Sequence, residues 1–89
     1  MSQERETREQ SAAEVGEQVA ALIMRLHIER GMPLDLVLSA AHAQVVTMMA
    51  AVLGGESAYR RCVHAAELAR PMLSLDDVTL AATTPEGRA

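Results

Sequence analysis

Aromatic side chains are almost absent from this 89-residue chain, which has no Phe, no Trp and a single Tyr. Large aromatic residues normally supply much of the apolar area of a protein core. A domain of this size has a thin core in any case, because it buries only about 60–65% of its unfolded surface. The core must therefore consist of Leu, Val, Ile, Met and Ala, and we expect association to supply further buried area.

Lysine is absent as well, so all eight basic residues are Arg. Arg without Lys, together with abundant Ala, is typical of a GC-rich bacterial coding bias. The net charge is −4, and the sequence has no basic cluster of the kind that binds nucleic-acid phosphates. With one aromatic residue it also lacks a platform for base stacking. Nucleic acid is therefore not a favoured partner.

The chain has one cysteine, Cys62, which excludes an intramolecular disulfide framework and fits a reducing compartment. Its first ten residues are polar and contain no apolar segment like that of a secretory signal. The sequence therefore predicts a cytoplasmic protein.

A long uncharged run is the most prominent feature that is present, extending over twenty residues from Leu36 to Gly55. Its length matches the roughly 20 apolar residues that cross a bilayer. Its content does not, because Ser39, His42, Gln44 and Thr47 interrupt it and no aromatic belt or basic cluster flanks it. We therefore expect this run to be a soluble helix that is covered by protein, with no membrane as partner.

Apolar periodicity and helix-ending residues predict an all-α domain with three helices and, at most, a short fourth. The predicted helices span residues 12–30, 33–53 and 56–70. Ser11 and Glu14 form a capping-box pattern at the first start, and Gly31 and Gly54 follow the first two helices. Residues 1–10 are predicted to be a polar lead-in or tail.

The helical domain is expected to cover residues 11–73. Residues 74–89 are predicted to be a short helix, which Ser74 would cap, or a loose tail. In the third helix, Tyr59 and Cys62 are predicted to lie in the apolar seam, whereas Arg60 and Arg61 look outward.

Apolar residues form regular stripes on the first two helices, with alternating spacings of three and four. The stripe of the first helix is Ala12, Val15, Val19, Leu22 and Leu26, and that of the second is Leu34, Leu38, Ala41, Val45, Met48 and Val52. Beyond Thr47 the second helix is apolar nearly all round, so it must be covered on every side. Two-fold self-association covers such a surface with one patch, so the domain is predicted to pair as a dimeric helical bundle. The predicted interface of the homodimer is Val45, Val46, Met48, Met49, Val52 and Leu53.

Three groups of polar residues deserve comparison with known catalytic and metal sites. Asp35, Ser39 and His42 form a strip on one helix, but a straight helix provides neither a sharply positioned nucleophile nor an oxyanion hole. His64 and Glu67 reverse the Glu-x-x-His order of di-iron helical bundles. Cys62 and His64 are two residues apart and point in different directions. We therefore expect no enzyme and no catalytic, cofactor or metal residues.

The sequence thus predicts a non-catalytic, self-associating helical module that acts through protein contacts as an adaptor, regulatory subunit or inhibitor. The alternative is a small transcriptional regulator with a helix-turn-helix over residues 50–64. Its recognition helix would present Ser57, Arg60 and Arg61, although the acidic charge balance disfavours binding to DNA.

Overall fold

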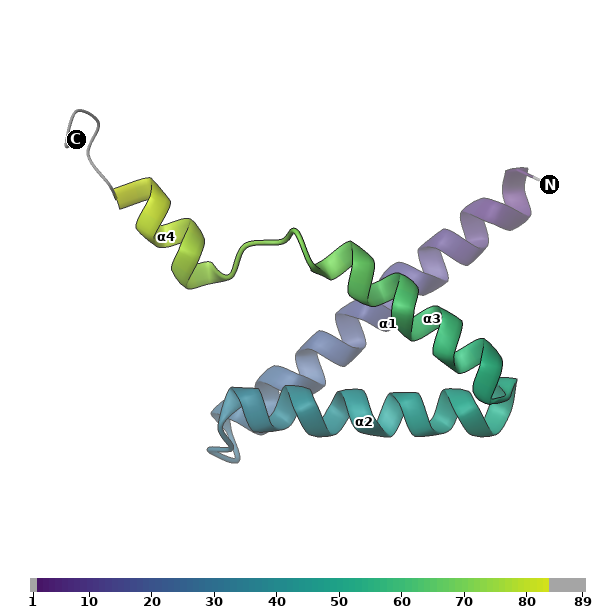
Figure 1. Cartoon of the computed structure of the whole chain (residues 1–89), viewed down its shortest axis with the longest axis horizontal. Helices are drawn as coiled ribbons and strands as arrows, with labels where there is room; N and C mark the ends of the chain where they lie inside the picture. The colour runs from purple at the N-terminus through teal and green to yellow at the C-terminus, as the bar shows by residue number, and fades with distance from the viewer. Residues whose placement is uncertain (1, 84–89) are drawn as a thin grey trace. The chain divides into compact units, whose positions relative to one another are not determined.

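Within residues 2–83, which the computed structural model describes, every regular element is an α-helix. The elements are α1 (Ser2–Ile28), α2 (Leu34–Leu53), α3 (Gly55–Ala69) and α4 (Leu75–Thr83) (Figure 1). The predicted all-α class, with three helices and a short fourth, is confirmed. Residues 84–89 of the predicted C-terminal tail lie outside the described residues.

Helix α1 begins at Ser2, ten residues before the predicted start. The capping-box interpretation of Ser11 is therefore wrong, because Ser11 lies inside the helix. The hydroxyl of Thr7, within the early turns of α1, donates to the carbonyl of Gln3 at 3.0 Å. This bond to the preceding turn lets a hydroxyl residue sit inside a helix instead of capping it.

A tight turn after α1 is closed by both backbone and side chain. Gly31 has φ of 70°, in the left-handed region that favours glycine after a helix. The amide of Met32 donates to the carbonyl of Leu26 at 3.4 Å. Nδ1 of His27 donates to the carbonyl oxygen of Met32 at 2.8 Å. His27, which sequence reasoning did not select, thus ties the end of α1 to the start of the next segment.

Two glycine substitutions test this turn in opposite directions. Gly31→Ala should lower the free energy of unfolding by about 1 kcal/mol, because alanine resists a positive φ. Gly16→Ala, inside α1, should raise it by about 0.5–1 kcal/mol, because alanine favours helix. An added Cβ would meet nothing within 4 Å at either site. Urea unfolding measures both, and equal effects of the two substitutions would contradict the role of the turn.

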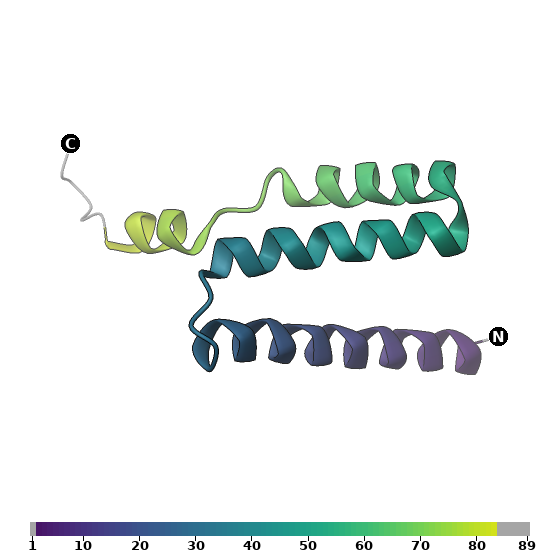
Figure 2. The same cartoon turned by 90° about the horizontal axis from the view of Figure 1, so that it is seen from below.

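The described chain divides into two units, Met1–Met48 and Met49–Ala89. In the first unit, the chain reverses direction at the turn, so α1 and α2 form an antiparallel hairpin (Figure 2), whose helices diverge with distance from the turn (Figure 1). Val37 is the buried residue of this unit, at 5% exposed. It does not belong to the predicted stripe of α2, so the helix turns a different side toward α1 than the stripe suggests.

The second unit contains the last turn of α2 with α3 and α4. Gly54, with φ of 91°, is the single non-helical residue between α2 and α3. Ala58 is its buried residue, at 3% exposed, whereas neighbouring Tyr59 is 64% exposed. The prediction that Tyr59 lies in the seam is therefore wrong for this chain. Ser74 caps α4, accepting a bond from the amide of Asp77 at 3.0 Å.

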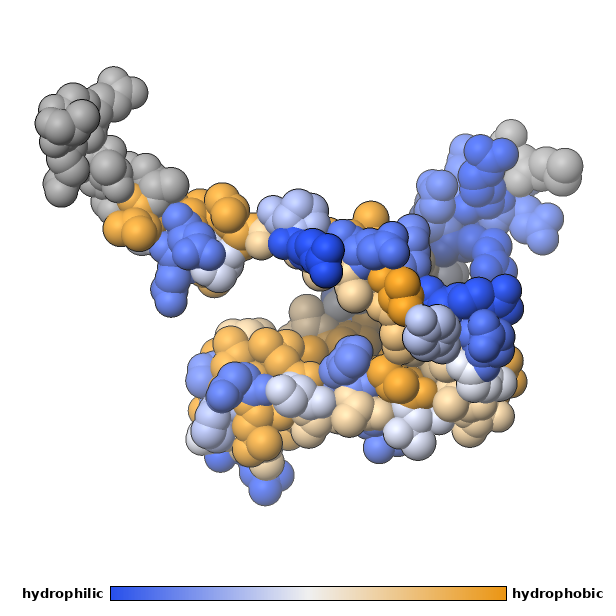
Figure 3. Space-filling model, in the orientation of Figure 1, coloured by the Kyte–Doolittle hydropathy of each residue, from blue (hydrophilic) through white to orange (hydrophobic). Residues whose placement is uncertain are grey.

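Burial is sparse in the whole described part of the chain. Val37 and Ala58 are its only buried residues, while nineteen large apolar residues are exposed. Figure 3 shows polar residues over the first turns of α1 and a largely apolar surface over α2. Within each unit, the described helices therefore have little apolar packing against one another.

Candidate interaction surface

The C-terminal half of α2 carries the predicted interface. Its six residues are Val45, Val46, Met48, Met49, Val52 and Leu53. At 100° per residue they occupy one continuous arc of about 160° around the helix. Four of them are exposed, and Val46 and Met49 are half-buried. Helix geometry therefore brings the predicted residues together on one open side of α2, called here the α2 face.

An apolar groove lies between α1 and the N-terminal half of α2, with a volume of about 540 Å³. Gln44 is the only polar residue of its lining. Its lining includes Val19, Leu22 and Leu26 from α1 and Leu36, Val37 and Ala40 from α2. The predicted stripes contained part of this lining, namely Val19, Leu22, Leu26, Ala41 and Val45. Sequence reasoning nevertheless missed the groove, because it did not establish which sides of the two helices meet.

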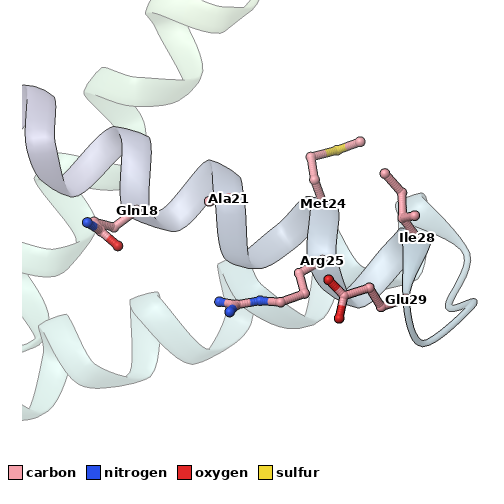
Figure 4. A pocket seen from close by; sticks show the side chains of 6 residues that line it. All are labelled: Gln18, Ala21, Met24, Arg25, Ile28 and Glu29. Carbon is pink, nitrogen blue, oxygen red and sulfur yellow. The ribbon is translucent and has the colours of Figure 1, made fainter.

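A second, shallower hollow lies on the outer side of α1, with a volume of about 420 Å³. Figure 4 shows Met24 and Ile28 pointing away from Arg25 and Glu29. Because its lining comes from α1 and the turn after it, this hollow has one wall and is open to solvent. It offers no enclosed cradle for a ligand.

Helix α2 is long and apolar enough to cross a membrane, judged by length and composition alone. Only 6% of its most apolar eighteen-residue window is buried within the chain. Among the described residues, no hydrogen bond joins one polar side chain of α2 to another. Thr47 satisfies its hydroxyl by donating to the carbonyl of Ala43 at 2.9 Å.

The polar strip of Asp35, Ser39 and His42 is exposed along its length. Among the described residues, no hydrogen bond joins these three side chains. The strip is therefore a set of separate solvated groups in the single chain, without the linked geometry that a catalytic triad requires.

The other polar candidates lie on α3. His64 and Glu67 are exposed and Cys62 is half-buried, one turn after buried Ala58. In the described part of the chain, no group of three His, Cys, Asp or Glu residues is placed to hold a metal ion.

The helix-turn-helix alternative depends on the connection between α2 and α3. That connection is one non-helical residue, Gly54, whereas a helix-turn-helix uses a turn of about three or four residues. Nε of Arg61 donates to Oγ of Ser57 at 3.4 Å, within α3 itself. Two of the three side chains proposed to contact DNA are thus bonded to each other, and no observation favours this alternative.

No protein-family model, curated protein or solved structure matches this chain. Its class therefore follows from the structure alone: residues 2–83 are all-α, with four helices and two apolar surfaces. These surfaces are the α2 face and the groove, and they share Val45.

Proposed function

We propose that this protein is a non-catalytic helical interaction module that self-associates through the α2 face. As a dimer it would act through protein contacts, as an adaptor, a regulatory subunit or an inhibitor. The observation that carries the proposal is that, among the residues whose burial is described, nineteen large apolar residues are exposed and two residues are buried. Exposed apolar patches on this scale mark interaction surfaces.

A second copy fits this surface better than a bilayer does. Ser39, His42 and Gln44 interrupt α2, and a polar group facing hydrocarbon without a partner costs several kcal/mol. At a protein interface the same groups can stay at a wet rim. In a two-fold dimer, the α2 face of one copy packs against the α2 face of the other, so the protein needs no second surface that is complementary to the first.

Sedimentation velocity on the full chain tests the proposal. We expect a species of twice the chain mass of 9.6 kDa at micromolar concentration, without detergent. A helical monomer at millimolar concentration would overturn the proposal, as would a protein that partitions completely into added phosphatidylcholine vesicles. Met49→Asp should abolish the dimer or the fold, because Met49 is half-buried within the α2 face.

A further inference from the structure

We propose that the groove is the inner half of a four-helix bundle, which the α1–α2 hairpin of a second copy completes by packing groove against groove. This inference rests on the proposed self-association and names the geometry of the dimer. It adds α1 to an interface that the proposed function places on α2 alone.

The shape of the lining supports a self-complementary fit. The groove is lined by the exposed large residues Leu22 and Leu36 and, further along α2, by the small residues Ala40 and Ala41. Large residues of one helical layer insert between the small residues of the facing layer in bundles. A two-fold axis brings the leucines of each copy toward the alanines of the other.

The absence of charge in the groove lining and the spacing of the apolar residues along α2 also favour a second copy of the chain as the partner. No charged residue lines the groove, so a charged partner would lose its hydration without gaining an ion pair. The stripe of Ala41, Val45, Met48 and Val52 continues from the groove into the α2 face. Alternating spacings of three and four are the pattern by which helices pack in bundles with a shallow crossing angle. The groove and the α2 face therefore form one continuous surface along α2.

A matched pair of variants on α1 tests the groove. Leu22 lines the groove and is 47% exposed, whereas Met24, two residues later, lies on the opposite side of the helix and is 42% exposed. Leu22→Asp should raise the dimer dissociation constant at least about 100-fold, because its charge would be buried without a partner. Met24→Asp should leave the constant within about threefold of the wild-type value.

Sedimentation equilibrium of both variants separates this inference from the proposed function. If Leu22→Asp dimerises like the wild type while Val52→Asp does not, the groove inference is wrong and self-association through the α2 face stands. If the wild type is monomeric, both proposals fail. Equal weakening by Leu22→Asp and Met24→Asp would also overturn the groove inference, because it would show no preference for the groove side of α1.

A second measurement applies even if Leu22→Asp fails to fold. Leu22→Cys and Met24→Cys, each made in a Cys62→Ser background, are treated with a polymer-linked maleimide over a range of protein concentrations. We expect labelling at position 22 to slow at least tenfold as the protein dimerises, with position 24 unchanged. Labelling at position 22 that does not depend on concentration would overturn the inference. So would native mass spectrometry showing a bound apolar small molecule in every dimer.

Discussion

The Val52→Asp protein should sediment as a monomer at concentrations where the wild type is a dimer. Val52 is 78% exposed, so the single chain loses almost no packing when this side chain is replaced. In the proposed dimer the same position lies in the α2 face, where a carboxylate would be buried without a partner at a cost of about 3 kcal/mol or more. That cost corresponds to a rise in the dissociation constant of at least about 100-fold.

Ala50→Asp is the matched control for this variant. Ala50 is exposed near the same helix end, and at 100° per residue it lies on the opposite side of α2 from Val52. Both variants add the same negative charge near the negative end of the helix dipole, which costs about 0.3–1 kcal/mol in each. Only Val52→Asp should lose the dimer in sedimentation velocity. If Val52→Asp dimerised with wild-type affinity, the α2 face could not be part of the dimer interface, and the prediction would be wrong.

The ends of the interior helices could be predicted because single residues determine them. Gly31 and Gly54 adopt positive φ at the two breaks where the sequence placed them, and the predicted cap at Ser74 is present. The start of α1 could not be predicted from caps, because its first turns instead carry residues of opposite charge spaced one turn apart in the sequence. These pairs are Glu4 with Arg8 and Arg5 with Glu9, whose i,i+4 spacing stabilises a helix by about 0.2–0.5 kcal/mol each.

The candidate site was predicted in part. The stripe on α2 and its apolar second half follow from periodicity, so Val45 and Val52 were found from the sequence. The groove was not, because it depends on the rotation of each helix about its own axis. That rotation is visible at Val37, which is buried although it lies off the predicted stripe. It is visible again on α3, where Ala58 is buried instead of Tyr59.

Thermal unfolding should depend on protein concentration, because so little of the core lies within one chain. When a native dimer unfolds to two separate chains, each tenfold increase in concentration stabilises it by about 1.4 kcal/mol. With an unfolding entropy typical of two chains of 89 residues, the midpoint temperature should rise by about 4 °C per tenfold increase. Circular dichroism at 222 nm over a thousandfold concentration range would measure this rise.

Val52→Asp gives this second prediction its control. The variant should unfold at a lower temperature than the wild type, and its midpoint should not change with concentration, because no partner stabilises its folded state. A wild-type midpoint that is independent of concentration would mean that the chain folds alone, although only two residues of its described part are buried. The two measurements are linked. Sedimentation of the variants shows which surface forms the dimer interface, and the midpoint temperature shows how much of the stability of the fold depends on dimerisation. If both change together in Val52→Asp, the α2 face supplies core that the single chain lacks.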